Sequence, residues 1–185
     1  MKKFVIGNGI LKAYFGRDEV VVVPDGVTHI GGELRNDEEC PDILRGDLIG
    51  YKAFRNAHIR ELYLPDSTVE IGFKALEHCR SLEVLSFSSA MKTFGCNAIN
   101  GCTSLKKIIY RGTIFDFTCL ETPGQTPDLD VVYCTDGEIR FGSDREYYIE
   151  TLFFPGTRAE WNARFKTDDW RNKRARKIVC IDEIG

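Results

Sequence analysis

The three histidines and seven cysteines of this sequence are the first candidates for nucleophiles, bases or metal ligands. Of His29, His58 and His78, only His78 stands directly beside a cysteine, Cys79. A thiol and an imidazole can form a nucleophile–base pair when the side chains meet. Zinc sites need closely spaced ligand pairs, and the sequence contains no Cys-x-x-Cys. His78 and Cys79 are therefore the candidate nucleophile–base pair, and whether their side chains can meet depends on the fold.

Other catalytic patterns are absent from the sequence. No glycine-rich phosphate loop follows a predicted strand, and no serine lies in a nucleophile-elbow motif. Asp136 and Asp182 follow similar apolar segments, which favours two equivalent turn residues over a catalytic carboxylate pair. We therefore predict no enzymatic activity, no cofactor and no metal site.

The segments that position these residues repeat with a period of 23 residues: Ile59–Leu64, Leu82–Phe87 and Leu105–Tyr110. A period of about 20–29 residues with one short apolar strand per unit is typical of a leucine-rich solenoid. The first, fourth and sixth positions of each strand should point inward, with Leu62, Leu85 and Ile108 in one interior row. Cys79 and its repeat equivalent Cys102 should also be buried as free thiols, which makes a reactive Cys79–His78 pair improbable.

Around the repeats the chain divides into three parts. Residues 1–17 contain Asn8-Gly9 between apolar runs, which predicts a β-hairpin that caps the solenoid. Residues 18–112 form the repeats, with an acidic insertion at about 31–48 that is either a solvated excursion or a loop on the binding face. Residues 113–185 contain two similar units, each a strand, a Gly-Thr turn with the spacing of a capping box, a short helix and a strand.

The pattern Ile-x-x-Leu-x-Leu-Pro-x-Ser-x-x-x-Ile-Gly-x-x-Ala from residue 59, with isoleucine at the first leucine position, resembles the BspA-like leucine-rich repeats. The opening hairpin, Pro24-Asp-Gly-Val-Thr28 and Gly156-Thr-x-x-Glu-Trp161 are also similar to that family. The resemblance implies a right-handed superhelix, mostly β with short turns and helices, whose parallel sheet lines the concave face. It also implies a surface protein that adheres to other proteins or cells, and it supplies no catalytic residues.

The third and fifth strand positions should face outward on the concave sheet. An exposed apolar strip is expected there, with two charged neighbours: Val22, Tyr63, Val84 and Ile109, beside Glu61 and Lys107. Such a strip indicates binding of a protein partner, although self-association or cover by another part of the chain would also explain it.

An alternative surface is basic. Residues 158–177 contain eight Arg/Lys against three acidic residues. A basic run beside a tryptophan can bind nucleic acid or an anionic surface, or it can be a solvated face next to acidic residues, such as the insertion of a second molecule. The candidate residues are Trp170, Arg171, Lys173, Arg174, Arg176 and Lys177.

The overall composition argues against two classes of protein, general nucleic-acid binders and membrane-spanning proteins. A formal net charge of −3 argues against general nucleic-acid affinity, and no apolar run is long enough for a membrane span. The absence of a signal peptide and the odd number of cysteines favour a cytoplasmic protein, whereas the family resemblance favours the cell surface if the chain is a fragment.

Overall fold

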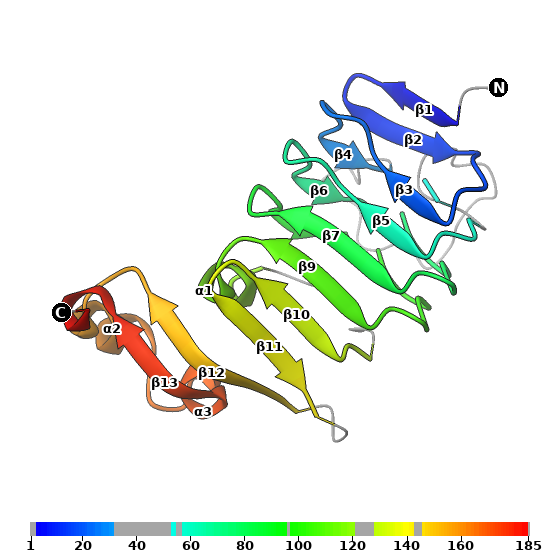
Figure 1. Cartoon of the computed structure of the whole chain (residues 1–185). Coiled ribbons are helices and arrows are strands. Elements are labelled where there is room, and N and C mark those ends of the chain that lie inside the picture. Colours follow the sequence, from blue (N-terminus) through cyan, green and yellow to red (C-terminus); the bar gives the residue numbers. More distant parts are fainter. Residues whose placement is uncertain are drawn as a thin grey trace.

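The computed structural model of the chain describes residues 3–31, 53–54, 57–95, 97–120, 128–142 and 146–184. The described chain winds through two sheets, with three short helices toward its C-terminus (Figure 1). We call the five-stranded sheet, ordered β1-β2-β4-β6-β8, sheet A, and the eight-stranded sheet, ordered β13-β12-β11-β10-β9-β7-β5-β3, sheet B. The predicted acidic insertion lies outside the described residues.

Sheet B contains the predicted repeat strands. Its members are β3 (Val20–Val22), β5 (Glu61–Tyr63), β7 (Val84–Ser88), β9 (Lys107–Arg111), β10 (Val131–Cys134), β11 (Gly137–Phe141), β12 (Tyr147–Phe154) and β13 (Ala175–Cys180). The strands from β3 to β10 are parallel, β11 is antiparallel to β10 and to β12, and β12 is parallel to β13. Seven of the eight strands therefore run in one direction.

In sheet A, the two-residue strands β4, β6 and β8 lie behind sheet B in Figure 1, and β1 and β2 lie at the N-terminal end. Its members are β1 (Phe4–Gly7), β2 (Ile10–Tyr14), β4 (His29–Ile30), β6 (Glu70–Ile71) and β8 (Thr93–Phe94). β1 and β2 form the predicted hairpin, and Asn8 and Gly9 adopt the positive φ values of 53° and 76° that this tight turn requires. The hairpin extends sheet A beyond β4, and its capping role remains a prediction.

The interior between the sheets is built from rows of side chains, one from each strand. Leu62, Leu85 and Ile108 are register partners on parallel strands and are at most 4% exposed, so the predicted interior row is confirmed. The row continues through residues on both sides: Val21, Val132, Ile139 and Ile149. One uninterrupted apolar row thus crosses seven strands of sheet B.

The Gly-Thr segments begin two helices of similar construction. The side chain of Thr113 caps α1 (Ile114–Thr118), and that of Thr157 caps α2 (Arg158–Arg164), both in complete capping boxes. Asp136 accepts a hydrogen bond from the first backbone N–H of α1 at 2.8 Å, and Asp182 does the same for α2 at 3.0 Å. These contacts confirm the interpretation of the two aspartates as equivalent structural residues.

The last helices join β12 to β13 and complete the core at that end. Trp161 of α2 is 1% exposed, and its indole N–H donates to Asn172 Oδ1 at 3.0 Å in α3 (Trp170–Arg174). Phe165 packs against Trp161 with ring centroids 4.5 Å apart. A 3₁₀ helix, η1 (Ile181–Glu183), follows β13.

Candidate interaction surface

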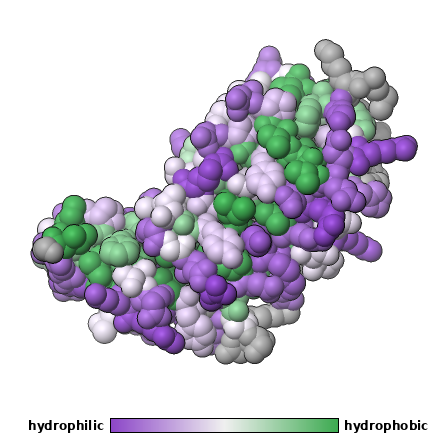
Figure 2. Space-filling view, viewed as in Figure 1, coloured by the Kyte–Doolittle hydropathy of each residue, from purple (hydrophilic) through white to green (hydrophobic). Residues whose placement is uncertain are grey.

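We call the face of sheet B opposite the buried rows its outer face; it is turned toward the viewer in Figures 1 and 2. The pairing register aligns the third strand positions as one outer row and the fifth positions as a second. The first row is Val20, Glu61, Val84, Lys107 and Val131. The second row is Val22, Tyr63, Ser86, Ile109 and Tyr133.

This register places the residues of the predicted strip in two adjacent rows. Val84 occupies a third strand position, where it pairs with Glu61 and Lys107, and the neighbour of Tyr63 on β7 is Ser86. Val22, Tyr63 and Ile109 share the row of fifth positions.

The apolar side chains on this face differ in exposure. Val20 and Val22 are 53% and 67% exposed, Tyr133 is 40% exposed, and Tyr63, Val84 and Ile109 are half-buried. Hydrophobic side chains gather over β3, β7 and β9 in Figure 2, with hydrophilic ones on either side. We call Val20, Val22, Tyr63, Val84, Ile109 and Tyr133 the outer patch.

Charged side chains contact the two tyrosines of the outer patch. The hydroxyl of Tyr63 donates to Glu61 Oε2 at 2.7 Å, and this bond, together with burial, raises the pKa of Tyr63. The Lys107 ammonium lies 5.8 Å from the ring centroid of Tyr133, a cation–π distance. Glu61 and Lys107 thus lie beside the patch, as predicted from their strand positions.

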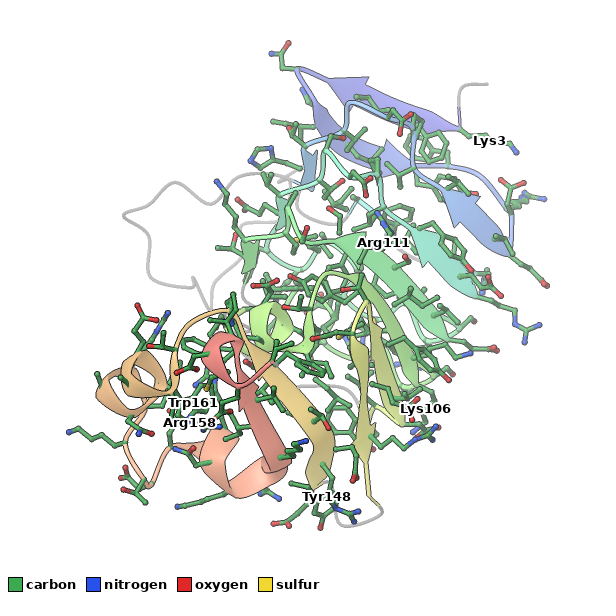
Figure 3. The ribbon with its side chains drawn as sticks, turned by 60° about the vertical axis from the view of Figure 1, so that its left-hand side comes forward. Lys3, Lys106, Arg111, Tyr148, Arg158 and Trp161 are labelled. Atoms are coloured by element: carbon green, nitrogen blue, oxygen red, sulfur yellow. The ribbon has the colours of Figure 1, made fainter. Side chains whose placement is uncertain are left out.

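Arg111 borders the outer patch, and the sequence reasoning missed it. Its guanidinium donates to Ser86 Oγ, to the carbonyl oxygen of Leu64 and to Asp66 Oδ1, each at 2.8 Å (Figure 3). These partners belong to β7 and to the segment after β5. Ser86 is only 2% exposed, although it belongs to the outer row, because Arg111 lies against it.

A row of alternating charge borders the opposite side of the outer patch, at the residue immediately before each of the strands β3, β5, β7, β9 and β10. Its members in strand order are Glu19, Arg60, Glu83, Lys106 and Asp130. Arg60 lies 2.9 Å from Glu83 and 4.0 Å from Glu19, and Lys106 lies 3.9 Å from Asp130. We call this the charged row. The 23-residue spacing of Arg60, Glu83 and Lys106 was a signal for it in the sequence.

The basic segment is divided between internal contacts and solvent. Arg171 is 12% exposed in its side chain, donates to the Thr118 carbonyl oxygen at 2.9 Å and stacks over Phe165. Arg174 pairs with Glu146 at 2.7 Å, and Arg176 pairs with Glu150 at 3.1 Å. The acidic neighbours are thus in β12 and just before it, within the same chain.

The remaining members of the basic segment include two exposed lysines, Lys173 and Lys177. Trp170 is the first residue of α3. The predicted basic residues therefore do not form one continuous cationic surface, since Arg171 serves mainly to attach α3 to the segment after α1.

The Cys79–His78 pair is not arranged for nucleophilic catalysis. Cys79 is fully buried, its thiol donates to the Phe54 carbonyl oxygen at 3.4 Å, and burial raises its pKa to about 12. Its repeat equivalent Cys102 donates to the Leu76 carbonyl oxygen at 3.1 Å, and burial raises its pKa to about 11. Because thiols react as thiolates, these two cysteines are structural.

Metal binding and membrane insertion depend on the side chains and helices that the described residues contain. Among them, no group of three or more His, Cys, Asp or Glu side chains is placed to hold a metal ion. No helix in this part of the chain is long and apolar enough to cross a membrane.

A family model described as a BspA-type leucine-rich repeat region, with six copies, matches residues 46–118. The matched range contains β5 to β9, which carry the central residues of the outer patch. Comparison with curated proteins and with solved structures gave no significant match. Residues 46–118 are therefore similar to leucine-rich repeat regions of the BspA type.

Proposed function

We propose that this chain binds a partner protein through the outer patch of sheet B, as an adhesion-type or scaffold-type module without catalytic activity. Leucine-rich repeat regions generally act in protein interactions and are generally non-catalytic. The partner would contact the sheet face that the family resemblance makes concave.

The exposed apolar surface of the patch is the observation that carries this proposal. Val20 and Val22 remain more than half exposed, although each belongs to a row that continues into half-buried apolar residues. Contiguous exposed apolar surface on a protein commonly marks an interaction site. Tyr63 lies between Val22 and Ser86 in the second row and is held by Glu61, so it would be an ordered aromatic anchor of the kind that dominates interface energetics.

The test compares three forms of the full chain: the wild type, Tyr63→Glu and Val5→Glu. Val5 is 42% exposed on β1 of sheet A, so its replacement is a matched apolar-to-acidic control away from the patch. Each form is immobilised and incubated with the same lysate of the source organism, and bound proteins are quantified. A protein held by wild type and by Val5→Glu but lost with Tyr63→Glu supports the proposal once it rebinds in purified form.

Two results would count against the outer patch. A large loss of thermal stability in Tyr63→Glu would show that Tyr63 is a core residue. Equal capture of every bound protein by Tyr63→Glu and by wild type would place the interface on another surface.

The alternative function, binding of nucleic acid or an anionic surface, depends on Arg176, Lys173 and Lys177, which are exposed. Phosphate binding of this kind weakens steeply with salt because counterions are released. Retention of a nucleic-acid probe by wild type at low salt, and its loss in Lys173→Glu, would support it. Absence of retention at every salt concentration removes it.

A further inference from the structure

The two end strands of sheet B, β3 and β13, carry the inference. Each pairs with a single neighbour in the part of the chain that the structure describes, so one edge of each strand has no described backbone partner. β11 is antiparallel to both of its neighbours, β10 and β12, so β12 runs in the same direction as β10. Because β13 is parallel to β12, it runs in the same direction as β3. The two edges lie at opposite ends of the sheet (Figure 1). Unpaired strand edges are ready templates for further pairing.

The residues of the two end strands match at three successive apolar positions, Val21 to Val23 and Ile178 to Cys180. The apolar segment of β3 and the residue after it, Val20 to Val23, corresponds to residues 177–180 of β13. Ile178 and Cys180 pair with the buried residues Leu152 and Phe154, just as Val21 pairs with Leu62. Each end strand therefore presents alternate apolar residues to the interior, in the pattern of consecutive repeats.

The charges at the starts of the two strands are opposite. The charged row ends at β3 with Glu19, whose side chain is 72% exposed. At the other end of the sheet, Glu150 and Arg176 form a similar pair, and Arg176 is 71% exposed. Placed one after the other, these residues continue the alternation without a break: Glu150, Arg176, then Glu19, Arg60 and Glu83 of the next molecule.

We infer that a second copy of this chain docks head to tail, with its β3 pairing in parallel against β13 of the first copy. Arg176 then faces Glu19 of the second copy, and the apolar register pairs Leu152–Ile178 and Phe153–Val179 continue into the second copy's Val21 and Val22. Docking covers Val22, the most exposed of the large apolar side chains on sheet B. This interface shares Val22 with the outer patch but leaves Tyr63 at the centre of the patch uncovered, so the charge reversals at Glu19 and Arg176 test it separately from the Tyr63→Glu test of the proposed function.

Two copies can join like edges in one sheet with the same face outward only by antiparallel pairing. β3 against β3, or β13 against β13, would therefore interrupt the parallel order of the strands and the alternation of the charged row. The remaining combination, β13 against β3, is a heterologous interface, so it forms open linear assemblies of many molecules unless the assembly closes into a ring.

The experiment measures the mass of the full chain in solution by sedimentation velocity over a range of protein concentrations. Wild type should associate in a concentration-dependent way, and more weakly at high salt. Glu19→Arg alone and Arg176→Glu alone should each weaken association by about tenfold, because each places like charges at the junction. An equimolar mixture of the two variants should restore association, since each variant then meets an opposite charge at both edges.

The control is Lys92→Glu, a charge reversal at an exposed residue beside sheet A, which should associate like wild type. Circular dichroism establishes that every variant is folded. A wild type that is monomeric at all concentrations at low salt overturns the inference. Association that persists unchanged in Glu19→Arg and Arg176→Glu, or a mixture that behaves like the separate variants, overturns it as well.

Discussion

Replacing Leu85 by alanine tests the row of buried side chains on which the fold depends. Leu85 is fully buried in β7, between its register partners Leu62 and Ile108. Truncating a buried leucine removes the transfer free energy of its methyl groups and leaves a cavity, at a cost of about 2–5 kcal/mol. Both neighbours belong to hydrogen-bonded strands that cannot readily close the cavity, so we expect about 3 kcal/mol, within that range.

The matched control is Val84→Ala, one residue earlier in the same strand. Val84 is half-buried on the outer face, so its truncation should cost about 1 kcal/mol or less. Urea unfolding followed by circular dichroism gives both free energies, with an unchanged m-value as the check on cooperativity. For a chain of this length, a loss of about 3 kcal/mol corresponds to a decrease in Tm of about 6–12 °C.

The comparison of adjacent residues makes the outcome decisive. A loss in Val84→Ala equal to or larger than that in Leu85→Ala would mean that the two faces of β7 have been exchanged. The interior row and the outer patch would then both be wrong. A small loss in both variants would instead show that the strands are not packed around a common interior.

Three further predictions concern single positions. Gly101 has a φ of 72°, and an added Cβ would lie 2.3 Å from the Nδ1 atom of His78. Gly101→Ala should therefore lower the free energy of unfolding, measured in urea, by at least about 1–2 kcal/mol. An unchanged urea midpoint would contradict this. In native protein, iodoacetamide should label the exposed Cys119 and leave Cys79 unmodified, as mass spectrometry of peptides can establish; equal labelling contradicts the burial. Hydrogen bonds from Arg158 lower the pKa of Glu183 to about 2, so this carboxylate stabilises the fold above its unfolded pKa and the contribution is lost as pH falls toward 2. The stability difference between wild type and Glu183→Gln should therefore shrink on acidification, and a constant difference would refute the assignment.

Local patterns were sufficient to predict several parts of this structure. The hairpin at Asn8-Gly9 and the capping boxes at Thr113 and Thr157 formed where the sequence placed them, because their geometry depends on residues only a few positions apart. The interior row at Leu62 and Leu85 followed from the period in the same way.

The candidate surface was less predictable. The strand positions of Tyr63, Val84 and Ile109 followed from the period, but the side chains that cover parts of this face did not. Arg111 was missed because its partners are up to 47 residues away and no repeat carries an equivalent arginine. The internal contacts of Arg171 were missed for the same reason, since its partner Thr118 is 53 residues away.

The sequence by itself determined the repeating strands, the buried rows and the type of repeat, because alternation and period decide which side chains leave water. Only the tertiary structure decided which polar side chains cover the outer face and which remain available. A long side chain such as that of Arg111 crosses neighbouring strands to reach its partners, and periodicity carries no information about that reach. The opposite charges at the two ends of sheet B likewise became visible only when the fold placed Glu19 and Arg176 on its two edge strands.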